Sequence, residues 1–124
     1  MKILPKINIR YAEISDIPFI INGIKQIIEI ESGDILIEES LIRTDRDKKA
    51  LDAINKKNIL IATIEHDLIG FIWFTISNKC PYGVNYGDYT KEYLWVDFSF
   101  VSKENRNKGI ATSLYKEVFK IASS

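Results

Sequence analysis

The residues best suited to chemistry with a ligand lie in a short basic turn, Arg106-Asn107-Lys108-Gly109-Ile110-Ala111, which follows a strongly apolar run. Gly109 has no Cβ, so the turn can adopt an unusual conformation and a ligand can approach the backbone closely. From Ile110 onward, apolar residues recur at helical spacing, and the N–H groups at a helix N-terminus favour negative charge. Between Lys103 and Lys120 five basic residues stand against two acidic ones, a local net charge of +3. The pattern predicts a turn that holds a phosphate.

Two common phosphate motifs do not fit this turn. A mononucleotide P-loop requires GxxxxGK followed by Ser or Thr, and a dinucleotide site requires GxGxxG, whereas Gly109 is the only glycine of the turn. Arg-x-x-Gly-x-Ala after a strand ending at Val101 resembles the acetyl-CoA signature of the GNAT N-acetyltransferase superfamily, Gln/Arg-x-x-Gly-x-Gly/Ala. The preceding Phe-Val-Ser-Lys-Glu-Asn is also similar, except that Lys103 stands where proline is frequent. The alternative is an ordinary strand–turn–helix with a glycine in its loop.

The resemblance implies that acetyl-CoA is the co-substrate and that backbone amides of the turn hold its pyrophosphate. It also implies that the peptide-like pantetheine arm pairs with the open edge of the preceding strand, where a bulge or splay aims a backbone N–H at the thioester carbonyl. The implied acetyl-CoA contacts are Ser99, Phe100, Val101, Arg106, Asn107, Lys108, Gly109, Ile110, Ala111 and Thr112.

Direct acetyl transfer to an amine also requires a base, because an alkyl ammonium has no lone pair. Asp97 is the candidate, and on a strand of period 2 it should share a face with Trp95 and Ser99. The alternative is that Asp97 is only a hydrogen-bonded or solvent-facing strand residue, and Glu92 is the reserve base. No general acid for the leaving thiolate can be identified.

Other candidate residues lie in two loops. Tyr82, Tyr86 and Tyr89 either form a wall of the acceptor pocket or cover the end of a hairpin. Cys80 has no activating base nearby in the sequence, and His66 is expected on the surface of a tight turn. One histidine and one cysteine exclude a zinc site of the His/Cys type within one chain, and no metal site is predicted.

These residues must be positioned by a chain whose predicted order is strand, helix, helix, strand, strand, strand, helix. The fold class is α/β (α+β): a central, mostly antiparallel sheet flanked by helices, as the resemblance to GNAT domains implies. The last predicted strand, Leu94 to Val101, is apolar enough to be covered on both faces. The other predicted elements are Ile7–Tyr11, a helix capped at Ser15 or Asp16, a helix from Glu38 to Asn55, a hairpin of Ile59–Ile64 and Leu68–Ser77 with a bulge near Gly70, and a helix from Ile110.

The length of 124 residues predicts one domain over residues 1–124. Lys plus Arg equals Asp plus Glu at 17 each, which gives no argument for a nucleic-acid partner. One cysteine and no apolar run long enough for a membrane span favour a soluble, cytoplasmic protein. GNAT domains usually continue with further strands, so we expect a domain short at the C-terminus, whose open sheet edge a homodimer could complete.

Two functions remain open at this point. The first is an N-acetyltransferase that moves an acetyl group from acetyl-CoA to a primary amine (a peptide N-terminus, a lysine or a small amine) by direct attack. The second is a catalytically degenerate domain of the same fold that binds CoA or another protein.

Overall fold

A computed structural model describes residues 6–32, 39–77 and 93–123 of the chain. In chain order the elements are β1 (Ile7–Tyr11), η1 (Ile14–Asp16), α1 (Ile17–Ser32), α2 (Glu39–Asn55), β2 (Ile59–Ile64), β3 (Asp67–Ser77), β4 (Tyr93–Val101), η2 (Lys103–Asn105) and α3 (Ile110–Ser123). The predicted order and class are confirmed, with element ends within one residue of those expected for β1, α2, β2, β3, β4 and α3. No helix within the described residues is both long and apolar enough to cross a membrane.

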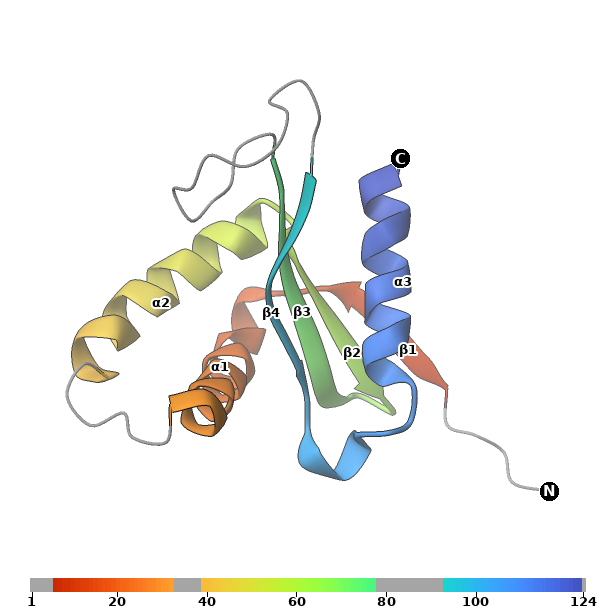
Figure 1. Ribbon diagram of the computed structural model, residues 1–124, viewed down its shortest axis with the longest axis horizontal. Coiled ribbons are helices and arrows are strands. Elements are labelled where there is room, and N and C mark those ends of the chain that lie inside the picture. The colour runs from red at the N-terminus through yellow and green to blue at the C-terminus, as the bar shows by residue number, and fades with distance from the viewer. Residues whose placement is uncertain (1–5, 33–38, 78–92, 124) are drawn as a thin grey trace.

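The four strands form one antiparallel sheet in the order β1-β2-β3-β4. In Figure 1, α1 and α2 lie on one face of this sheet and α3 lies on the other. Each face therefore has its own apolar layer. The layer under α1 and α2 contains Ile20, Ile24, Ile61, Phe71 and Phe100, and the layer under α3 contains Ile72, Phe74, Ile110, Leu114 and Val118.

Helix α1 sits close to the sheet because Gly23 faces it. A Cβ added at Gly23 would lie 2.6 Å from Phe71 Cε1 and 2.9 Å from Phe100 Cδ2. The ring of Phe19, one turn earlier on the helix, meets these two rings edge-on at centroid distances of 6.1 and 6.0 Å. This cluster fixes α1 against the C-terminal end of β4, which leads into the basic turn.

The helical segment that leads into α1 begins with η1, whose N-cap is Glu13 rather than Ser15 or Asp16. Asp16, which is 3% exposed, instead completes a capping box with Glu13 from the third position of η1. Its carboxylate accepts hydrogen bonds from Arg10 Nη1 at 2.7 Å and from the backbone N–H of Glu13 at 2.7 Å. Burial raises the pKa of Asp16, but the bonds from Arg10 and Glu13 outweigh burial and hold the pKa below its usual value. Asp16 thus ties the end of β1 to the first turn of the helical layer.

β4 is less buried than its apolar sequence predicts. Only Phe100 among its residues is fully buried, and the other eight are half-buried. The reason is topological: among the described strands β4 pairs only with β3, so its outer edge has no neighbouring strand there.

Two bulges interrupt the strand pairing. The first lies beside Gly70, as predicted, since Ala62 pairs with Gly70 while the next residue, Thr63, pairs with Leu68. The second is in β4: Trp73 pairs with Phe98 but Phe74 pairs with Val96, which leaves Asp97 as the extra residue. A bulge changes the direction in which neighbouring side chains point.

Candidate functional site

The basic turn has the backbone conformation that its sequence indicated. Asn107 and Gly109 both have positive φ angles, 65° and 78°. The first helical hydrogen bond of α3 runs from the N–H of Ser113 to the carbonyl of Gly109 at 3.0 Å. The N–H groups of Ile110, Ala111 and Thr112 therefore precede the first intrahelical bond and lie at the positive end of the helix dipole.

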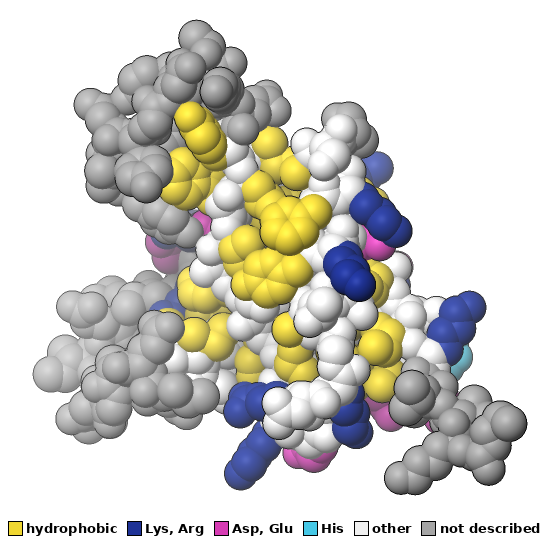
Figure 2. All heavy atoms as spheres, turned by 45° about the vertical axis from the view of Figure 1, so that its right-hand side comes forward, with side chains coloured by type: hydrophobic (Ala, Val, Ile, Leu, Met, Phe, Trp, Pro, Cys, Tyr) yellow, Lys and Arg dark blue, Asp and Glu magenta, His cyan; other side chains and the backbone are white. Residues whose placement is uncertain are grey.

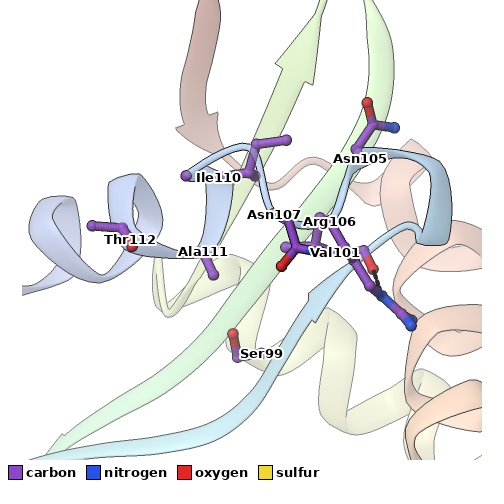
Figure 3. A pocket seen from close by; sticks show the side chains of 9 residues that line it. Ser99, Val101, Asn105, Arg106, Asn107, Ile110, Ala111 and Thr112 are labelled. Atoms are coloured by element: carbon purple, nitrogen blue, oxygen red, sulfur yellow. Dashed lines mark hydrogen bonds between the residues drawn. The ribbon is translucent and has the colours of Figure 1, made fainter.

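A cavity of about 440 Å³ lies against this turn. Figure 3 shows Ser99 of β4 and Ala111 of α3 on opposite sides of the gap between strand and helix. Eight of the ten residues predicted to contact acetyl-CoA line the cavity: Ser99, Val101, Arg106, Asn107, Gly109, Ile110, Ala111 and Thr112. Phe100 and Lys108 do not line it, and the side chain of Phe100 packs under α1 on the other face of the sheet.

Asn105 lines the cavity without having been predicted to do so. Its Nδ2 donates to Ser102 Oγ at 2.8 Å, which braces the short η2 turn. An asparagine in a polar loop is so common that its sequence carried no signal for this position.

The guanidinium of Arg106 turns back toward β4. Its Nε donates to the carbonyl oxygen of Val101 at 3.0 Å, the dashed line in Figure 3. Arg106 therefore connects the turn to the last residue of the strand, in addition to placing positive charge there. In Figure 1, η2 and the turn into α3 lie at the lower end of the molecule. Figure 2 shows Lys and Arg side chains gathered at this end.

The outer edge of β4 presents backbone groups beside the cavity. The N–H of Ser102 donates to the carbonyl of Ile69 at 2.8 Å, so this residue pairs inward with β3. Because inward and outward pairs alternate along an antiparallel strand, Phe100 also pairs inward, while Ser99 and Val101 turn their backbone groups to the outer edge. An extended ligand along this edge would find the N–H and carbonyl of Ser99 and the N–H of Val101 there.

The bulge places Asp97 differently from the prediction. Asp97 does share a face with Trp95, since its Oδ2 accepts a hydrogen bond at 2.9 Å from Thr75, the residue paired with Trp95. Ser99 lies between Phe98 and Phe100, which pack under α1, and its own side chain lines the cavity beside α3. The expectation that Asp97 and Ser99 share a face is wrong, because the extra residue breaks the period of 2.

The remaining candidates fall into two groups. Cys80, Tyr82, Tyr86, Tyr89 and Glu92 lie outside the described residues. His66 is exposed, with a positive φ of 74°, in the turn between β2 and β3. Its place at the surface agrees with the expectation from the sequence.

Comparison with known proteins agrees with this geometry. The model of the acetyltransferase (GNAT) family matches residues 24–124. The chain therefore belongs to this family, and the resemblance noted in the sequence is confirmed. The family uses acetyl-CoA as co-substrate, which makes the chain an acyl-CoA-dependent N-acetyltransferase by class. No curated protein sequence matches it significantly.

Solved structures share the fold over nearly the whole chain. A "predicted acetyltransferase with acetyl-CoA" of Clostridium acetobutylicum is 17% identical with a TM-score of 0.72, over 95% of this chain and 74% of the other. The PaiA N-acetyltransferase of Thermoplasma acidophilum, solved with coenzyme A, is 25% identical with a TM-score of 0.69, over 95% and 72%. An aminoglycoside N-acetyltransferase solved with CoA is 16% identical with a TM-score of 0.71, over 99% and 73%.

Proposed function

We propose that this protein transfers the acetyl group of acetyl-CoA directly to a primary amine, with Asp97 as the general base. The observation that carries the proposal is the cavity between β4 and α3, which is lined by eight of the ten predicted acetyl-CoA contacts. The acceptor belongs to the amines that a peptide N-terminus, a lysine or a small molecule offers. Aminoglycosides are the acceptors named for two proteins of similar fold, and they provide a first small-molecule test.

The cavity suits the donor on three counts. The first N–H groups of α3 and the positive φ angles of Asn107 and Gly109 give a concave set of backbone donors, which favours a pyrophosphate. A Cβ added at Gly109 would meet no heavy atom within 4 Å, so the turn leaves room for a bulky group. The outward backbone groups of Ser99 and Val101 can pair with the amides of a pantetheine arm, as a strand would.

Because of the bulge, Asp97 lies on the face of the sheet opposite the cavity. As the base, it would reach the outer edge of β4 from that face. Because β4 lies at an edge of the described sheet, a group lying along that edge can be reached from both faces. The donor would lie on the α3 side, at Ser99, and the amine would approach from the side of Trp95 and Asp97. The backbone N–H groups at the bulge are candidates for polarising the thioester carbonyl.

The transfer requires a base, a nitrogen with a free lone pair and a sulfur that can leave as a thiolate. The ammonium loses a proton, directly or through a water, to the carboxylate of Asp97, which gives the nitrogen its lone pair. The nitrogen then forms the C–N bond, the C–S bond breaks, and its electron pair stays on the sulfur as a thiolate. As the amide forms, the nitrogen gives its second proton to solvent water, so the products are the amide and the CoA thiolate, with one proton on Asp97 and one in solvent. The thiolate is a good leaving group, because thiols are far more acidic than alcohols.

The experiment has a binding step and a turnover step. Thermal melting is measured with acetyl-CoA, with CoA and with ATP; a ligand at a hundred times its dissociation constant stabilises the native state by about 2.7 kcal/mol. Release of free thiol from acetyl-CoA is then followed with three acceptors: an aminoglycoside, a diamine, and a peptide with a free N-terminus and one lysine. We expect stabilisation by both CoA species but not ATP, and turnover with at least one amine.

The melting and turnover measurements together distinguish an acetyltransferase from a domain that only binds CoA. Stabilisation without turnover on any acceptor would refute the catalytic proposal and favour a domain that only binds CoA. Absence of stabilisation by either CoA species would refute the placement of the donor at the β4–α3 turn.

A further inference from the structure

The hydroxyl of Thr75 holds the carboxylate of Asp97. Thr75 Oγ1 donates to Asp97 Oδ2 at 2.9 Å, between two residues that are 22 positions apart and partly buried. The two strands that carry them are adjacent, but the bulge takes Asp97 out of the regular register between β3 and β4. The hydrogen bond is therefore a contact through which β3 sets the direction of this side chain.

Aromatic residues lie on the same face of the sheet as that contact. Trp73 lies two residues before Thr75 on the same face of β3, and Trp95 lies directly opposite Thr75 on β4. The ring of Trp73 packs on Phe98 at a centroid distance of 5.7 Å, and that of Trp95 packs on Tyr93 at 6.2 Å. These aromatic residues share a face with the partly buried Thr75–Asp97 hydrogen bond, and a hydrogen bond to a carboxylate is stronger in a less polar environment than in water.

A base acts well only when its lone pair points at the proton that it removes. The side chain of Asp97 rotates about two bonds, and the bulge changes the direction in which this side chain leaves the strand. A hydrogen bond to one carboxylate oxygen fixes the plane of the group and thus the direction of the other oxygen. Positioning of this kind contributes to the rate without any contact with the substrate.

We propose that Thr75 is a positioning residue for acetyl transfer: it orients the carboxylate of Asp97 toward the amine on the face of the sheet opposite the acetyl-CoA turn. This inference rests on the proposed function, in which Asp97 is the base. It assigns a role to a β3 residue that lies outside both the cavity and the sequence motif.

The test compares single and double variants in the turnover assay, at saturating acetyl-CoA and saturating amine. Thr75→Val keeps the branched shape and removes the hydroxyl, whereas Thr75→Ser keeps the hydroxyl. We expect kcat to fall roughly ten- to a hundredfold with valine, the effect of a lost hydrogen bond to a charged group, and to stay within about threefold of the original with serine. The KM for acetyl-CoA should stay unchanged in both, because the donor site lies on the other face.

A double-variant cycle isolates the connection to Asp97. Asp97→Asn should lower kcat by about 10²–10⁴ if the carboxylate is the base. In that background Thr75→Val should have less than about a twofold further effect, because the group that Thr75 orients is gone. Thr63→Val is the matched control: Thr63 is a buried threonine of β2, on the side of β3 away from β4, and its loss should leave kcat as it is.

The outcomes distinguish a failure of the proposed acetyl transfer from a failure of the positioning role of Thr75. If the unaltered protein turns over no amine, the proposed function falls and the inference falls with it. If Asp97→Asn keeps full kcat, the base is another group and the role of Thr75 is refuted while acetyl transfer stands. If Asp97→Asn is impaired but Thr75→Val is not, or if their effects multiply, only the positioning role is refuted. Melting curves accompany every variant, and Thr75→Ala replaces the valine variant if that one does not fold.

Discussion

Replacing Gly109 by alanine, asparagine and tryptophan separates the two contributions that this residue makes to the turn. Its φ is 78°, in the left-handed region, and a Cβ at this position meets no heavy atom within 4 Å. Alanine therefore adds no clash, but an L residue in this conformation costs about 1–2 kcal/mol. For a chain of this size, that corresponds to a fall in Tm of about 3–12 °C. Asparagine tolerates the left-handed region and should cost less.

Tryptophan adds bulk to the same strain. Because Gly109 lines the cavity of about 440 Å³ where the pyrophosphate is expected, we expect the tryptophan side chain to fill part of that space. All three variants should fold, because the position contacts nothing in the core. The stabilisation of about 2.7 kcal/mol expected from CoA at a hundred times its dissociation constant should vanish in Gly109→Trp, and most of it should remain in Gly109→Asn.

The assay is the shift of Tm by CoA for each variant, taken relative to the Tm of that variant alone. This difference removes the effect of backbone strain on stability and leaves the effect on binding. A tryptophan variant that still responds to CoA as the unaltered protein does would show that the ligand does not pass Gly109. A loss of response in the asparagine variant as large as that in the tryptophan variant would show that backbone conformation, and not space, is what the ligand requires.

Two further predictions concern the scaffold that carries the site. Gly23→Ala should destabilise the protein by about 1–3 kcal/mol, since its Cβ would lie 2.6 Å from Phe71 Cε1, and urea unfolding should show a lower midpoint; an unchanged midpoint would mean that α1 can move away from the sheet freely. The pKa of Asp16 is lowered in the folded protein. Its ion pair with Arg10 therefore stabilises the fold at pH values above 3.8, the ordinary pKa of this carboxyl, and the stabilisation is lost as the pH falls through the lower pKa of the folded state. Asp16→Asn should therefore be less stable at pH 7, and should lose less stability than the unaltered protein between pH 5 and pH 2, as followed by thermal melting; parallel curves for both proteins would contradict this.

Much of the fold could be predicted because the sequence patterns that indicate it are local. The alternation in Ile7–Tyr11, the helical spacing after Ile110 and the tight turn at Glu65 and His66 each depend on a few neighbouring residues. The cavity beside the basic turn could be predicted for the same reason. Its Gly109, small Ala111 and preceding strand are contiguous in sequence, and the fold brings them into one cavity without long-range pairing.

The parts that were missed depend on pairing between distant segments. The apolar residues of β4 indicated burial on both faces, but burial depends on which strands flank it, and β4 has only β3 beside it in the described sheet. The position of Asp97 depends on the register between β3 and β4, and one extra residue reverses the faces that follow it. The hydrogen bond from Thr75 to Asp97 could not be predicted without that register.

In the proposed reaction, the bulge lets one short strand serve two substrates. In a regular strand, Trp95, Asp97 and Ser99 would all point to the same side, and a base on that side would compete with the donor for space. With the extra residue, Asp97 stays on the face of Trp95 and Thr75, while Ser99 points to the cavity beside α3. The donor and the amine can then approach the edge of β4 from opposite faces and meet where the backbone is irregular. In the proposed reaction, the hydroxyl of Thr75 on the neighbouring strand sets the direction of that carboxylate.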